Sequence, residues 1–104
     1  MAFEIGLAIV EALRPLMARI GACDGDLARQ IRRAASSVPL NVAEGRRRSG
    51  KDRAYHYRVA AGSAAEVRAA LRVVAAWGYL EARELAAPLA LCERELRLLH
   101  GLAK

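Results

Sequence analysis

Residues 30–45 read QIRRAASSVPLNVAEG, and the polar side chains of this stretch recur with the spacing of one face of an α-helix. They are separated by three, four, four and three residues, while apolar residues recur at the same period on the opposite side. This pattern predicts a helix with one apolar face and one hydrogen-bonding face. The polar set is Gln30, Arg33, Ser37, Asn41 and Glu44, and the apolar set is Leu27, Ile31, Ala34, Ala35, Val38 and Val42.

Helical periodicity continues through the rest of the chain and predicts four helices and no strand. The first helix is expected over residues 3–20 with a kink before Pro15, because proline removes a backbone donor and clashes with the preceding turn. Residues 21–25 are expected to form the turn that follows. Asp24 or Asp26 can then accept the free amides at the start of the second helix.

The second helix is expected to reach about Glu44, because its polar stripe stays in register across Pro39. Gly45 is predicted to supply a left-handed exit from it. The third helix is expected over residues 51–77, with Ser49 as its N-cap and Asp52 three positions later.

The fourth helix is expected over residues 81–102, with a regular part that starts only at Pro88. Four helices joined by short turns predict an all-α fold, an antiparallel up-and-down four-helix bundle, in a single domain over residues 1–104. The third helix is rich in alanine and small or apolar on more than one face. A single copy would leave part of that apolar surface exposed to solvent, so self-association is expected.

Positive charge is concentrated in the middle of the chain. Residues 29–72 hold eleven basic and three acidic residues, a net charge of +8, and the remainder contributes −2 to the total of +6. Basic side chains followed by tyrosines can contact phosphates and stack on unpaired bases, so this region is predicted to bind RNA or DNA. The residues expected to do so are Arg46, Arg47, Arg48, Lys51, Arg53 and Arg58.

Two other interpretations of the basic region stay open. It can be a solvated turn whose charges keep the protein soluble, or it can recruit a protein with an acidic surface, which would make the chain an interaction scaffold. Arginine outnumbers lysine fifteen to two, but a GC-rich genome would produce the same ratio.

Motifs for catalysis, metal binding and cofactor binding are missing from the sequence. It has no Glu-x-x-His pair, no glycine-rich phosphate loop, no nucleophile elbow and no zinc spacing, so we expect no enzyme, no metal and no cofactor. Cys23 and Cys92 are predicted to be free thiols, with Cys92 on an apolar stripe. No long uncharged apolar run is present, so a cytoplasmic protein without membrane contact is expected.

Three segments together resemble a known family. The stretch at residues 30–45, AAGSAAEVRAAL at 60–71 and WGYL at 77–80 resemble the four-helix-bundle proteins found in some bacterial large-subunit ribosomal RNA intervening sequences. The resemblance implies a four-helix fold and a ring-like homopentamer. Relatives that accompany diversity-generating retroelements are basic oligomeric proteins that bind nucleic acid, so the resemblance also favours nucleic-acid binding.

The positions that match the family pattern suggest a polar network. Ser63 and Glu66 lie three residues apart on the third helix, and a hairpin would bring them against the polar stripe of the second. We expect a buried ion pair between Arg33 and Glu66, with Gly62 letting the backbones approach. A catalytic carboxylate site is the alternative. The expected packing and assembly network comprises Gln30, Arg33, Ser37, Asn41, Glu44, Ser63 and Glu66.

Overall fold

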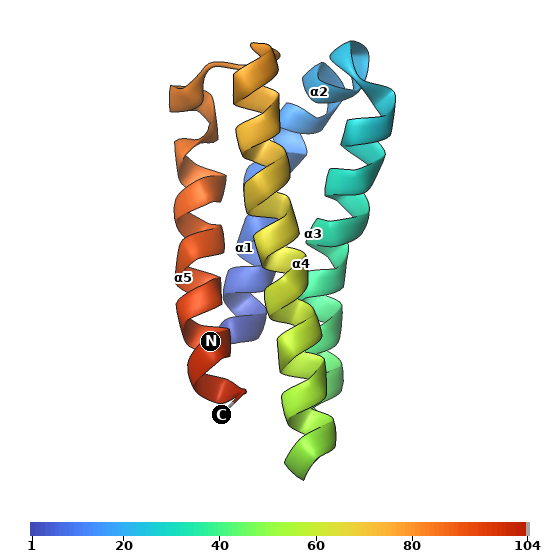
Figure 1. Ribbon diagram of the computed structural model, residues 1–104, viewed down its shortest axis with the longest axis vertical. Helices are drawn as coiled ribbons and strands as arrows, with labels where there is room; N and C mark the ends of the chain where they lie inside the picture. The colour runs from blue at the N-terminus through green and yellow to red at the C-terminus, as the bar shows by residue number, and fades with distance from the viewer. Residues whose placement is uncertain (104) are drawn as a thin grey trace.

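Helices account for nearly all of the computed structural model, which describes residues 1–103, and no strand occurs among those residues. Four arms lie side by side and alternate in direction, which confirms the predicted all-α, up-and-down bundle (Figure 1). In chain order the elements are α1 (Ala2–Leu13), the 3₁₀ turn η1 (Arg14–Leu16), α2 (Met17–Cys23), α3 (Gly25–Arg46), α4 (Gly50–Trp77), the 3₁₀ turn η2 (Ala82–Leu85) and α5 (Ala86–Leu102).

The four arms surround one apolar core. α1 packs against α3 and α5, and α4 packs against the same two helices, so α1 and α4 lie at opposite corners of the bundle. The apolar stripes predicted from the sequence point inward. Their fully buried members include Ile9, Ile20, Ile31, Leu71 and Leu99.

The two prolines of the first half of the chain have different effects. Pro15 lies in η1, which separates α1 from α2, so the predicted break in the first helix is confirmed. Pro39 is buried inside α3, which continues past it to Arg46. At the same crossing, a Cβ atom on Gly6 of α1 would lie 3.2 Å from the Cα of Pro39, so this glycine lets the two helices approach closely.

The caps at the starts of α3 and α4 agree only in part with those predicted from the sequence. The Asp24 carboxylate accepts a hydrogen bond from the backbone N–H of Leu27 at 3.0 Å and caps α3, as predicted. Ser49 occupies the N-cap position of α4, but its side chain makes no capping hydrogen bond, so that part of the prediction was wrong. Instead of completing a capping box, Asp52 pairs with Arg48.

Gly45 does not provide a left-handed exit. It lies inside α3, and the glycines with positive φ are Gly50 at 58° and Gly78 at 77°. A Cβ atom on Gly45 would lie 2.6 Å from Cε1 of Tyr57. Glycine is therefore needed here because the ring of Tyr57 packs directly against the backbone of α3.

The last arm was expected over residues 81–102, with a regular part that starts at Pro88. The 3₁₀ turn η2 occupies Ala82–Leu85, and the regular helix α5 starts at Ala86, two residues before Pro88. Pro88 falls in the first turn of α5, where no helical hydrogen bond needs its missing N–H. Cys92 is buried on its apolar face, and burial raises the pKa of its thiol to about 11. Cys23 is exposed, and both thiols are free, as predicted. None of the described helices is long and apolar enough to span a membrane.

Candidate nucleic-acid interface

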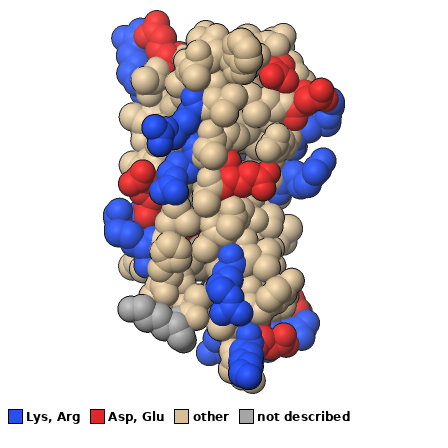
Figure 2. All heavy atoms as spheres, in the orientation of Figure 1, with Lys and Arg blue, Asp and Glu red and all other residues tan. Residues whose placement is uncertain are grey.

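The connection between α3 and α4 extends beyond the ends of α1 and α5 (Figure 1). We call residues 44–53 the basic hairpin. It carries five basic and two acidic residues, a net charge of +3. Figure 2 shows basic side chains gathered at this end of the molecule. The five cations predicted here, Arg46, Arg47, Arg48, Lys51 and Arg53, are all exposed.

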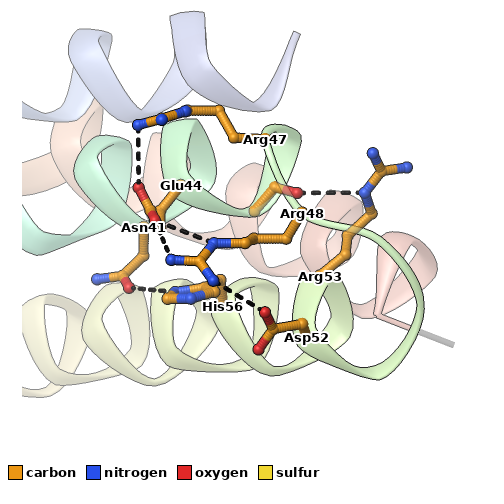
Figure 3. A network of polar contacts seen from close by, with 8 residues as sticks. Asn41, Glu44, Arg47, Arg48, Asp52, Arg53 and His56 are labelled. Carbon is orange, nitrogen blue, oxygen red and sulfur yellow. Dashed lines mark hydrogen bonds and ion pairs between the residues drawn. The ribbon is translucent and has the colours of Figure 1, made fainter.

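Arg48 links the two sides of the basic hairpin (Figure 3). Its Nη2 atom lies 2.7 Å from Oε1 of Glu44, and its Nη1 atom lies 3.0 Å from Oδ2 of Asp52. The hydrogen bond that Arg48 donates lowers the pKa of the Glu44 carboxyl. Two carboxylates thus hold this guanidinium, which leaves it less available to a phosphate.

Arg53 has a structural contact of another kind. Its Nε atom donates to the carbonyl oxygen of Gly45 at 3.2 Å (Figure 3). Its Nη2 atom donates to the carbonyl oxygen of Arg46 at 3.4 Å. These carbonyls belong to the last turn of α3, where helical partners are missing. Arg53 therefore caps α3 from the first turn of α4.

The remaining cations of the hairpin face solvent. Lys51 makes no ion pair within the described residues, and Arg47 makes only a 3.8 Å contact with Glu44 and is 79% exposed. The guanidinium of Arg46 lies 5.9 Å from the centre of the Phe3 ring, a cation–π contact that leaves its N–H groups open. Tyr55 follows on α4 with 55% of its surface exposed. Three cations of the hairpin therefore face solvent, and Tyr55, four residues after Lys51, shares the side of α4 on which Lys51 lies.

Arg58, the sixth predicted cation, lies elsewhere. It lines a groove between α4 and α5 together with Arg68 and Arg97. Helical rotation explains the separation, because five residues beyond Arg53 a side chain points to a different side of α4. Arg58 therefore does not belong to the basic hairpin.

Part of the predicted polar network is present between α3 and α4. The Ser63 hydroxyl donates to Oγ of Ser37 at 2.8 Å, and the Asn41 amide donates to the same Oγ at 2.9 Å. Nδ1 of His56 lies 3.3 Å from Oδ1 of Asn41 (Figure 3), a contact that was not predicted from the sequence. This network links α3 to α4 next to the basic hairpin, so it can hold the hairpin in place.

The predicted ion pair between Arg33 and Glu66 was wrong. Both side chains are exposed, as is Gln30, and no ion pair joins them among residues 1–103. Because these side chains are exposed, water solvates the charges of Arg33 and Glu66, and neither charge needs a buried partner. Gly62 does not serve close packing either, because a Cβ atom there would have no neighbour within 4 Å.

Glu95 is a buried acid that was also not predicted. Its side chain is fully buried in the bundle, and neither carboxylate oxygen has a hydrogen-bond partner in the described part of the chain. Burial raises its pKa to about 7. Its position three residues after Cys92 and four before Leu99, on the apolar stripe of α5, is the sequence signal that could have revealed it. No group of three metal-ligating side chains occurs within residues 1–103.

Comparison with known proteins agrees with this fold. A family model described as "23S rRNA-intervening sequence protein" matches residues 2–101. The chain belongs to this family. Its structure is similar to the crystal structure of a protein of unknown function from the S23 ribosomal protein family of Bacteroides thetaiotaomicron, with a TM-score of 0.89 and 16% sequence identity. That match covers 100% of this chain and 99% of the other, and no curated protein matches significantly.

Proposed function

We propose that this member of the 23S rRNA-intervening sequence protein family is a non-enzymatic, self-assembling protein, most simply a homopentamer, that binds RNA or DNA through its basic hairpin. The observation that carries the proposal is the hairpin itself. It protrudes from the bundle and presents Arg46, Arg47 and Lys51 to solvent, and the exposed ring of Tyr55 follows Lys51 by four residues on α4.

The chemistry of the hairpin suits a nucleic-acid backbone. Three solvent-facing cations can each contact a phosphate. Tyr55 offers a ring for base stacking. Arg48 and Arg53 are already engaged within the hairpin, so they hold its shape while the other cations remain open to phosphates.

Self-assembly is supported by the exposed apolar side chains. Val73 is 41% exposed and Trp77 is 69% exposed on α4, and Leu40 is 67% exposed on α3. Large apolar side chains that face water favour contact with another surface. Repeating the basic hairpin around a ring would also raise the avidity for a long polyanion without any new contact.

The experiment compares two triple variants that remove equal charge. Replacing Arg46, Arg47 and Lys51 with Ala should weaken binding to a single-stranded RNA probe and to duplex DNA alike. It should also flatten the plot of log affinity against log salt by roughly 0.7 to 0.9 for each phosphate that the variant no longer neutralises. The matched control replaces the exposed residues Arg14, Arg72 and Arg94 with Ala, far from the hairpin in sequence.

An equal reduction of affinity and slope in both variants would mean that only total charge matters and that the hairpin is not the binding surface. Failure of the wild-type chain to bind any nucleic acid at low salt would refute nucleic-acid binding. That result would favour the scaffold hypothesis, in which the basic surface recruits an acidic protein.

A further inference from the structure

A groove of about 680 Å³ runs between α4 and α5, on the other side of α4 from the polar network. Several residues that line it have small or apolar side chains, and these do not fill the space between the two helices. These residues are Ala61, Gly62, Ala65 and Leu96. Gly62 has open space where a Cβ atom would be, so nothing from the same chain fills this part of the groove.

The charged residues along the groove are mostly basic. They are Arg58, Arg68, Arg97, His100 and a single acid, Glu93. None of the three arginines forms an ion pair with a carboxylate among residues 1–103. No Phe, Tyr or Trp side chain lines the groove in the described part of the chain, so His100 is the one ring there on which a base could stack. Its chemistry suits a helix with an apolar ridge flanked by acids.

The chain itself carries such a helix face. Glu4, Leu7 and Glu11 are exposed and follow one another at steps of three and four along α1, so they share its outer side. Leu7 keeps 42% of its surface exposed between the two acids. The opposite side of α1 is buried through Ile5 and Ile9, so the outer side can be covered only by another molecule.

We propose that the outer face of α1 from a second copy of this chain docks in the groove between α4 and α5. Leu7 would lie on the apolar lining, and Glu11 would face the arginines. The dimensions agree, because Arg58 and Arg68 are about 15 Å apart along α4 and the twelve residues of α1 span about 18 Å. This inference rests on the self-assembly proposed above and names the surfaces that carry it.

The two surfaces lie on different sides of the molecule, since α1 and α4 occupy opposite corners of the bundle (Figure 1). Each copy would therefore use one surface toward each of two neighbours. Such a head-to-tail contact closes into a ring when the rotation between copies permits it. Glu11 is the acid to test, because Glu4 already contacts the amino group of Met1 at 2.7 Å.

A steric variant tests the groove without disturbing packing within the chain. Gly62→Leu adds a side chain where the single copy has open space, and leucine has the higher helix propensity, so the bundle should keep its helical circular dichroism. Light scattering should show the wild type as a multiple of the 11.3 kDa chain mass and Gly62→Leu shifted toward one chain. The control is Gly101→Leu, which also adds a side chain in open space, on α5. Gly78 cannot serve as a control site, because its φ is positive and any side chain there would be strained.

Charge reversal provides a second, independent test. Glu11→Arg alone, and the double variant Arg58→Glu with Arg97→Glu, should each raise the dissociation constant of the assembly by roughly tenfold or more. Combining all three substitutions in one chain should restore assembly, because every contact between copies then pairs opposite charges again, whatever the number of copies in the ring. Arg72→Glu, on the exposed side of α4 and outside the groove, should have little effect.

The outcomes separate this inference from the proposed function. A wild-type chain that scatters as a monomer would refute self-assembly and this contact together. An oligomeric wild type whose mass is unchanged in Gly62→Leu and in both charge variants would refute the contact alone. A combined triple variant that assembles no better than the two defective variants would also count against head-to-tail docking.

Discussion

Replacing Glu95 with Met should make the stability of the bundle less dependent on pH. The Glu95 side chain is fully buried and neither of its oxygens has a hydrogen-bond partner among the described residues. Burial raises its pKa from 4.5 to about 7; the nearby amino terminus opposes this rise and Glu4 adds to it. Met has nearly the same length and no ionisable group, so the variant removes the titration without leaving a large cavity.

The sign and size of the effect follow from proton linkage. Because the pKa of Glu95 is higher in the folded state, the folded chain binds more protons than the unfolded chain between pH 4.5 and about 7. The free energy of unfolding should therefore fall as the pH rises through this window and level off above it. A shift from 4.5 to about 7 corresponds to a loss of roughly 3 kcal/mol in the wild type.

Urea unfolding followed by circular dichroism measures the free energy of unfolding at each pH. All samples are kept at one protein concentration, because any association between copies would add to the measured stability. The stability advantage of Glu95→Met over the wild type should grow by roughly 3 kcal/mol between pH 4.5 and about pH 8. Glu66→Gln, at an exposed site, serves as the charge control and should run parallel to the wild type. A difference between Glu95→Met and the wild type that stays constant with pH would refute the reasoning.

Two further predictions concern close packing and thiol burial. Gly45→Ala should lower the free energy of unfolding by about 1–3 kcal/mol, because its methyl group would collide with the Tyr57 ring, whereas Gly62→Ala should raise it by up to about 1 kcal/mol. Urea titrations that rank the two variants in the other order would contradict this. In the native protein a thiol reagent should modify Cys23 at once and Cys92 only as the chain unfolds, because Cys92 is buried and its thiol pKa is raised to about 11. Equal modification rates measured by mass spectrometry would show that α5 opens readily.

Local rules were sufficient for the helices themselves and for some of their ends. The periodicity of residues 30–45 places Ile31 and Val38 inside and Ser37 and Asn41 on the polar side, as the structure has them. Proline geometry likewise predicts the break at Pro15. These features depend on neighbours within about one helical turn, and such neighbours can be read directly from the sequence.

The candidate site was predicted only in part, because some of its contacts join residues of different helices. The sequence identified the cluster of cations in the basic hairpin, but not that Glu44 and Asp52 hold Arg48 or that Arg53 caps α3. Those contacts depend on where two helix ends meet. The same holds for Arg58, which the rotation of α4 places in a groove with α5.

The sequence by itself determined the approximate helix boundaries, the apolar and polar faces and the location of the positive charge, because each follows from helical periodicity and composition. Only the tertiary structure decided that Gly45 accommodates Tyr57, that Arg33 and Glu66 stay in water, and that Glu95 is buried without a partner among the described residues. The physical reason is that a repeat of 3.6 residues specifies which way a side chain points from its own helix. It does not specify how far or at what rotation the neighbouring helix lies, and that placement sets each contact between helices.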